Sequence, residues 1–152
     1  MLRISKLTDY ATVILSHMAK NTDHVHSAIG LAEATGINLP TVSKIMKMLV
    51  NGKVLVSSRG SNGGYALART PERISIADVI SILEGPIGLT ECSISHEGCE
   101  QATGCGIGAN WGVINQAVHN TLASISLADM IKPINVPQEF LIPVSSLYRT
   151  SL

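Results

Sequence analysis

Aromatic and charged side chains are both scarce in this chain of 152 residues. Aromatic residues make up 3% of it and charged residues 14%, whereas hydrophobic residues reach 45%. No apolar run approaches the roughly 18 residues needed to cross a bilayer, so the sequence predicts no membrane partner. The aliphatic residues are expected to fill a core, built mostly from Leu, Ile, Val, Met and Ala, or a subunit interface.

Cysteine is limited to Cys92, Cys99 and Cys105, all within one Gly-rich polar stretch. Buried structural cysteines usually stand singly among apolar residues, so this cluster indicates a set of ligands in a loop. An odd number of thiols argues against a closed disulfide framework, and no signal peptide directs the chain to an oxidising compartment. We therefore expect a metal site in a cytoplasmic protein.

The spacing of these cysteines favours an iron-sulfur cluster over zinc. Structural zinc sites usually pair cysteines roughly two to four residues apart. Here six and then five residues intervene. A DNA-binding protein with structural zinc stays the alternative. Thiolates are soft ligands suited to a cluster, and three of them leave room for a fourth ligand. The candidates for that ligand are Asp9, His96, Glu97 and Glu100.

The formal net charge is zero, but the charges are segregated along the chain. Residues 34–71 contain five basic side chains and no acidic one, and residues 72–105 contain six acidic side chains and one basic one. The first segment could face phosphates, whereas the second, which holds the cysteines, would be repelled by them. A nucleic-acid contact is therefore expected in the first half of the chain.

Helix signals in the first third of the chain predict a helix-turn-helix. Apolar residues at helical spacing indicate a helix over Leu7–Met18. Ser27 can cap a short helix through Ala34, which Gly36 ends, and Asn38 can cap a further helix that runs to Asn51. Two helices joined by a tight turn that contains glycine are typical of DNA-binding modules.

A β-hairpin is expected directly after these helices. The short β-rich runs 53–58 and 65–68 flank a Gly-rich turn, so they indicate a wing. The last helix of the predicted motif separates apolar side chains from small polar and basic ones, which suits insertion into the major groove. The alternative is an ordinary solvated helix face. The predicted DNA-contacting residues are Asn38, Thr41, Ser43, Lys44, Lys47, Arg59 and Ser61, with Arg59 placed to enter the minor groove.

The second half of the chain begins with a capping box at Ser75 and Asp78, which predicts a helix ending at Gly85. A longer helix is expected over 109–125, with Ile114, Val118, Thr121, Leu122 and Ile125 on one face. The expected fold is therefore mainly α with a small hairpin wing. Its predicted parts are a winged helix-turn-helix (1–72), a cysteine loop with the long helix (73–131) and an irregular tail (132–152). We find no catalytic motif and expect no enzyme.

Several motifs together resemble the winged-helix iron-sulfur regulators of the IscR and NsrR type, over nearly all of residues 1–131. They are Thr8-Asp9-Tyr10-Ala11, the wing sequence 59–65, the helix 76–83 and the three-cysteine loop. The opening residues 1–10 resemble the subgroup of regulators of SUF-type cluster assembly. This resemblance implies a cytoplasmic repressor of cluster-assembly genes, and a nitric oxide or redox sensor with the same parts is the alternative.

The resemblance also implies a homodimer in which the long helix crosses its partner, and a cluster that controls affinity for a palindromic operator. IscR-like members supply a histidine three positions after the last cysteine, where this chain has Gly108. NsrR-like members instead supply an aspartate from the start of the first helix of the other subunit, a place that Asp9 occupies here. The implied ligands are therefore Cys92, Cys99, Cys105 and the partner subunit's Asp9, around a 4Fe-4S cluster in preference to 2Fe-2S.

Overall fold

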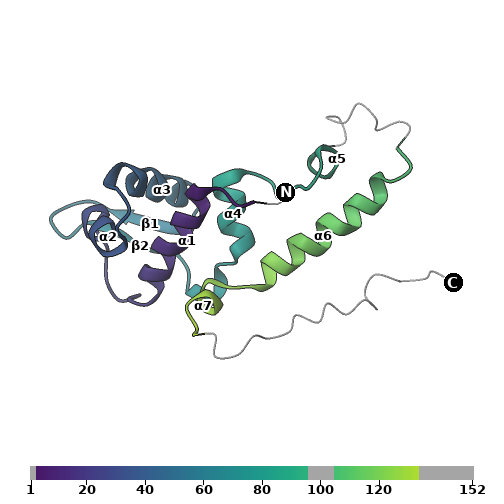
Figure 1. The fold of residues 1–152 in the computed structure, drawn as a ribbon. Coiled ribbons are helices and arrows are strands. Elements are labelled where there is room, and N and C mark those ends of the chain that lie inside the picture. The colour runs from purple at the N-terminus through teal and green to yellow at the C-terminus, as the bar shows by residue number, and fades with distance from the viewer. Residues whose placement is uncertain (1–2, 96–104, 134–152) are drawn as a thin grey trace.

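The computed structural model describes residues 3–95 and 105–133. It is mainly helical with one antiparallel hairpin, as the sequence predicts (Figure 1). The elements in chain order are α1 (Lys6–Ala19), α2 (Ala28–Thr35), α3 (Leu39–Asn51), β1 (Leu55–Ser58), β2 (Gly64–Leu67), η1 (Pro71–Arg73), α4 (Ile76–Glu84), α5 (Glu91–Ile94), α6 (Gly108–Ser124) and α7 (Leu127–Met130).

The first three helices begin at side-chain caps. Ser5, Ser27 and Asn38 each accept a hydrogen bond from a backbone N–H in the first turn of the helix that follows. Gly36 ends α2 in the left-handed conformation, at a φ of 71°, which glycine adopts without a steric penalty. The predicted bounds of the second and third helices are therefore confirmed to within a residue.

The wing is a two-stranded sheet whose register runs from Leu55 opposite Leu67 to Ser58 opposite Gly64. The segment before α2 pairs with it, because His26 and Tyr65 exchange two backbone hydrogen bonds of 2.8 Å. Gly64 is required at this contact, since a Cβ there would lie 2.6 Å from the His26 carbonyl oxygen. The wing is thereby fixed to the loop that precedes α2.

One hydrophobic core joins the helices of both halves of the chain. Leu15 of α1 and Leu49 of α3 are fully buried in it, together with Val79 of α4 and Leu127 of α7. Elements from beyond residue 72 thus complete the core of the helix-turn-helix. The division of the chain at residue 72 stays a prediction.

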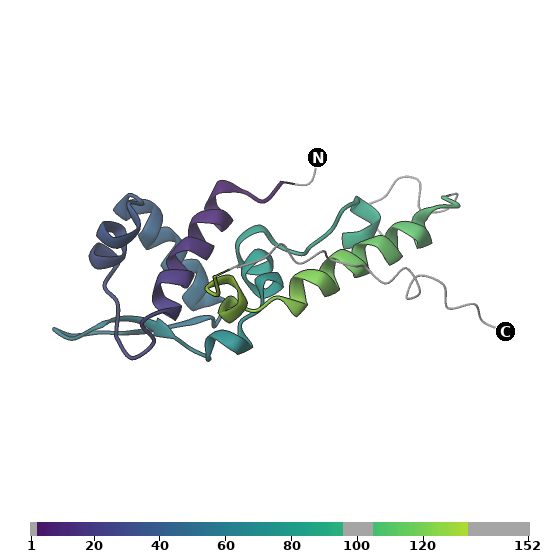
Figure 2. The same cartoon turned by 60° about the horizontal axis from the view of Figure 1, so that its bottom comes forward.

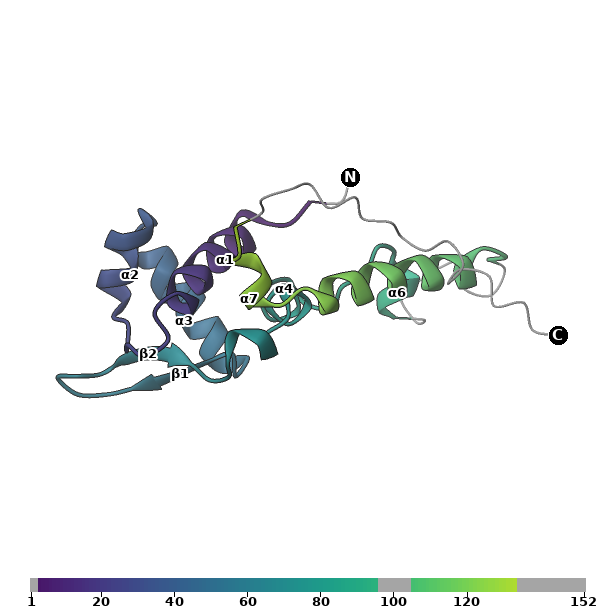
Figure 3. The same ribbon diagram turned by 90° about the horizontal axis from the view of Figure 1, so that it is seen from below.

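Helix α6 and the wing project from this core toward opposite ends of the molecule (Figures 2 and 3). None of the 17 residues of α6 is fully buried. The short helix α5 packs beside the beginning of α6. Because α5 contains Cys92, the expectation that this cysteine lies in a loop is wrong: it occupies a helical turn. Within the described ranges, no helix is long and apolar enough to span a membrane.

Candidate functional site

Helix α3 divides its side chains as the sequence predicts. Val42 and Ile45 are fully buried, as are Met46 and Leu49, and they anchor α3 in the core. Ser43, Lys44 and Lys47 are exposed on the other side, and Thr41 is half-buried. The exposed lysines can reach phosphates or base edges, while the buried residues keep the helix in a fixed orientation. Their contact with DNA stays a prediction.

Asn38 has a structural task at the start of this helix. Its side-chain Oδ1 accepts a hydrogen bond of 3.0 Å from the backbone N–H of Thr41. The amide nitrogen of Asn38 is not used in this cap and is the group that could donate to DNA. Pro40 lies in the first turn, where its missing N–H costs nothing.

Arg59 and Ser61 lie in the turn of the wing, where both are exposed. Gly60 has a φ of 113°, and a Cβ at Gly63 would lie 2.5 Å from the Ser58 carbonyl oxygen. The turn therefore needs both glycines to hold its backbone close. Strand β1 packs against α3, so the wing and the predicted recognition helix form one unit.

Two of the three cysteines lie in the part of the chain that the structure describes. Both are free thiols, with Cys92 half-buried in α5 and Cys105 exposed just before α6. The Thr90 hydroxyl lies 3.1 Å from the Cys92 Sγ and 2.8 Å from the Ser93 hydroxyl. Cys99 lies outside the described residues, as do His96, Glu97 and Glu100. Among the side chains described, no three His, Cys, Asp or Glu residues come together as a metal site.

Position 108 lies beside the Cys105 thiol. A Cβ built on Gly108 would be 3.8 Å from the Cys105 Sγ, so a ligating side chain here could share a metal with that thiol. Glycine supplies no such side chain. If Cys105 binds a cluster, the fourth ligand is therefore expected from another residue.

Asp9 is exposed in the first turn of α1. Its side chain lines a groove formed by Arg3, Ile4, Lys6, Asp9, Thr12, Ile76 and Met130. No cysteine is among these described lining residues. An exposed carboxylate is available to another subunit. The partner subunit's Asp9 as a ligand stays a prediction.

Sequence reasoning missed two residues that hold the segment leading to Cys92. Glu84, at the end of α4, accepts a hydrogen bond of 2.9 Å from the backbone N–H of Ser5. The Thr8 hydroxyl and the Ser5 N–H hold the pKa of the Glu84 carboxyl below its usual value. Asn115 of α6 accepts from the Leu89 N–H at 3.0 Å and donates to the Ile87 carbonyl at 3.2 Å. The partners are 26 to 79 residues apart, so no local pattern could have revealed these contacts.

A family model described as "Iron-dependent Transcriptional regulator", Rrf2, matches residues 4–133. The chain belongs to the Rrf2 family. Among relatives of this Rrf2 regulator, IscR of Xenorhabdus nematophila is 32% identical over 102 residues. That match covers 67% of this chain and 62% of the relative, so it spans less than two thirds of the relative's length.

Solved structures of Rrf2-type regulators share its fold. CymR, the global cysteine regulator of Bacillus subtilis, matches with a TM-score of 0.68 and 30% identity, over 86% of this chain and 97% of CymR. IscR of T. potens matches with a TM-score of 0.64 and 26% identity, over 86% of each chain. The winged-helix fold and the resemblance to IscR-type regulators are thus confirmed. The Rrf2 chain is a DNA-binding transcriptional regulator, and the expectation that it is no enzyme is confirmed by its relatives.

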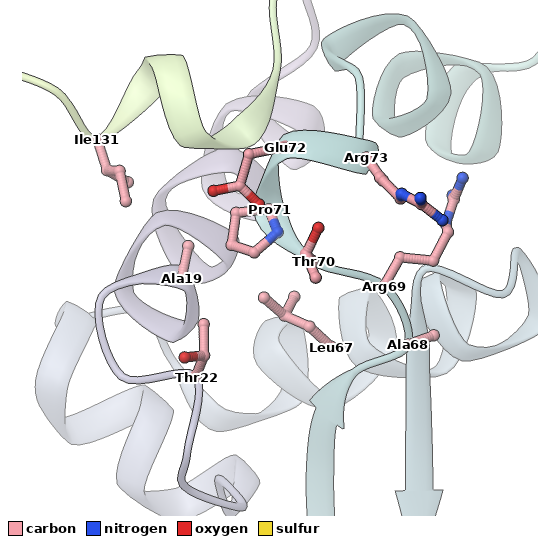
Figure 4. Close-up of a pocket in the computed structure, with 10 residues that line it drawn as sticks. All are labelled: Ala19, Thr22, Leu67, Ala68, Arg69, Thr70, Pro71, Glu72, Arg73 and Ile131. Atoms are coloured by element: carbon pink, nitrogen blue, oxygen red, sulfur yellow. The ribbon is translucent and has the colours of Figure 1, made fainter.

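A cavity of about 760 Å³ lies away from the predicted site residues of this Rrf2 regulator, between the end of α1, β2, η1 and α7 (Figure 4). The side chains of Arg69 and Arg73 extend toward one another at one side of it. Arg69 also pairs with Asp78 at 3.6 Å. The residues that line the cavity are Ala19, Thr22, Leu67, Ala68, Arg69, Thr70, Pro71, Glu72, Arg73 and Ile131.

Proposed function

We propose that this Rrf2-family protein is a homodimeric repressor that senses iron-sulfur status and controls genes of cluster assembly. The observation that carries the proposal is that Cys92, in α5, and Cys105, just before α6, are both free thiols, and that α5 packs against α6. Together with Cys99 they form a donor set of three soft thiolates, which is the chemistry that iron-sulfur clusters require. The similarity to IscR proteins supports the same assignment.

The described residues fit a cluster in two further respects. The thiols are unpaired and reach the surface, so an assembly partner could deliver a cluster to them. A hydroxyl beside Cys92 can donate a hydrogen bond to a thiolate sulfur. Cys92, Cys99 and Cys105 would hold a 4Fe-4S cluster, with the partner subunit's Asp9 as the fourth ligand. When bound, such a cluster makes the site responsive to iron supply, oxygen or nitric oxide.

The proposed dimer rests on the exposure of α6. A helix of 17 residues with no fully buried side chain leaves much of its apolar surface in water. Val113 is 53% exposed and Ile114 is 45% exposed. A second copy of the helix would cover these side chains in a two-fold interface. Two-fold symmetry would also place two copies of α3 on a palindromic operator.

The proposed function is tested by anaerobic purification followed by operator binding. We expect the visible absorption of an iron-sulfur cluster, iron and sulfide in equal amounts, and different operator affinities for holo and apo protein. Colourless protein with stoichiometric zinc would support the structural-zinc alternative. Equal operator affinities for the two forms would contradict the sensing role even if a cluster is present.

Nitric oxide distinguishes the alternative sensor from the proposed one. A nitric oxide sensor loses its cluster spectrum and its operator affinity when stoichiometric nitric oxide is added. An iron chelator added at the same concentration leaves both unchanged. For the proposed function we expect slow removal of iron by a chelator to change operator affinity as well.

A further inference from the structure

We propose that residues 85–90, which we name the connector, transmit the state of Cys92 to the DNA-reading helices, with Glu84 and Asn115 as its two positioning residues. The connector joins α4 to α5 and therefore lies directly between the helix-turn-helix core and the cysteine site. This inference rests on the proposed function, since it concerns how cluster state changes DNA affinity.

Glu84 attaches the beginning of the connector to α1. Its carboxylate accepts a hydrogen bond of 2.9 Å from the Ser5 backbone N–H, and Ser5 is also the cap of α1. Thr8 is fully buried and forms a further side-chain hydrogen bond to Ser5 at 3.2 Å. A shift of the end of α4 therefore has to displace the first turn of α1, or break these bonds.

Asn115 attaches the far half of the connector to α6. Its side-chain amide donates to the Ile87 carbonyl and accepts from the Leu89 N–H, which uses both polar ends of the amide. These two hydrogen bonds, to residues 87 and 89, hold the connector backbone against α6. Asn115 is half-buried, so these bonds are partly shielded from water.

The connector is in tight contact with the helix that carries Cys92. A Cβ on Gly88 would overlap the side chain of Ile94, so the connector contacts α5 closely at this residue. Thr90, the last connector residue, lies 3.1 Å from the Cys92 Sγ. A movement of α5 when Cys92 gains or loses a ligand is therefore passed to the connector.

The route ends at the predicted recognition helix through the core. Ile14 and Leu15 of α1 are fully buried in the same cluster as Ile45 and Leu49 of α3. Close-packed interiors transmit displacement, because side chains there cannot shift independently. A change in the first turn of α1 can thus alter the orientation of α3 without any direct contact between the cysteines and DNA.

The test compares Glu84→Gln and Asn115→Leu with the parent dimer, measuring the ratio of operator Kd values between apo and holo protein. Glutamine keeps the shape of Glu84 but removes its charge, and leucine keeps the size of Asn115 but removes both hydrogen bonds. With cluster content equal by visible absorption, we expect each variant to reduce the ratio by about 5-fold or more, within the usual range of allosteric coupling. Glu72→Gln, an exposed carboxylate in η1, is the matched control and should keep the parent ratio.

The double variant decides whether the two residues act through one element. Because both anchor the same connector, the double variant should reduce the ratio no further than the stronger single variant. Unchanged ratios in both fully loaded single variants, or effects that multiply in the double variant, overturn the proposal. A parent protein with no cluster, or with equal apo and holo affinities, overturns the proposed function and this inference with it.

Hydrogen exchange of the apo dimers gives a readout that needs no cluster. We expect Glu84→Gln to accelerate amide exchange at Ser5 and also at Leu89, whose N–H is bonded to Asn115 and not to Glu84. Asn115→Leu should in turn accelerate exchange at Ser5. Exchange that changes only at the residue bonded to the substituted side chain shows two independent contacts and contradicts the proposal.

Discussion

At the scale of single residues, the ligand role proposed for Asp9 depends on a second subunit. Its carboxylate is exposed, and no three potential metal ligands come together among the described residues of one chain. We expect Asp9→Ala to leave the cysteine ligands in place but to accelerate cluster loss, because one iron would lack its protein ligand. The decay of visible absorption in the presence of an iron chelator measures this rate.

Asp23→Ala is the matched control for Asp9, since Asp23 is an exposed aspartate in the turn that follows α1. Its cluster should decay at the parent rate. Identical cluster lifetime, spectrum and operator affinity in Asp9→Ala and the parent would show that the fourth ligand is another group. Gly108 cannot be that group, although its position beside the Cys105 thiol would suit one.

At the scale of elements, α3 presents exposed lysines on a rigidly anchored helix. Each lysine that neutralises a phosphate should add about 0.9 to the slope of log affinity against log salt concentration. We expect Lys44→Ala to weaken operator binding and to reduce that slope by about one. Lys20→Ala, an exposed lysine at the end of α1, should leave the slope unchanged. A parent slope in Lys44→Ala would mean that Lys44 does not contact the backbone of DNA.

The start of α7 contains a carboxylate that we expect to contribute to the acid response of the fold. Lys132, at 2.7 Å from the Asp129 carboxylate, holds the pKa of Asp129 below its usual value, and the Ser126 hydroxyl and N–H act in the same direction. The unfolded state therefore takes up a proton at higher pH than the folded state does. The stabilisation is present above the ordinary aspartate pKa and is lost as pH falls through the lower folded value.

We expect the Tm to fall as the pH is lowered below the ordinary pKa of aspartate, and to fall less in Asp129→Asn. Asparagine cannot lose a charge on acidification, so its contribution does not change with pH. Thermal unfolding of the apo protein at neutral and acidic pH measures the difference. An equal fall in both proteins would show that other carboxylates, such as Glu84 and Glu72, whose pKa values are also lowered, dominate the acid response.

Local signals in the sequence predicted most elements because caps and glycines act within a few residues. Ser27, Gly36 and Asn38 mark the ends of α2 and α3, and the capping box at Ser75 marks α4. Helix α5 was missed because a single turn has too few residues for a periodic pattern. Contacts such as Glu84 with Ser5 depend on the packing of distant segments, which no local pattern encodes. The cysteines were found from their chemistry alone.

At the scale of the whole molecule, two surfaces face opposite ends. The wing and the predicted recognition helix lie toward one end, and α5 with the beginning of α6 lies toward the other (Figure 3). In the proposed function, a signal received at the cysteines therefore has to cross the molecule to reach DNA. The connector and α6 are the described segments that run from the core to the cysteine end. We propose that the connector carries a signal within one chain and that α6 joins two chains.

The apolar face of α6 that the sequence predicts is divided in the structure. Val118 and Leu122 line a groove of their own chain together with Ile80 of α4, whereas Ile114 stays 45% exposed. A charge at position 114 should therefore leave the folding of one chain intact and disrupt contact with a second copy. We expect Ile114→Glu to convert the dimer to a monomer and to weaken binding to a palindromic operator, because each half-site would then be bound independently.

Sedimentation or light scattering measures the mass of Ile114→Glu, and circular dichroism shows whether each chain stays folded. Gln116→Glu is the matched control, because Gln116 is exposed in the same helix but two residues further on, and thus points elsewhere. It should stay dimeric and bind the operator like the parent. A dimeric Ile114→Glu with parent affinity would place the subunit interface elsewhere, and the partner subunit's Asp9 would then have no route to the cysteines across α6.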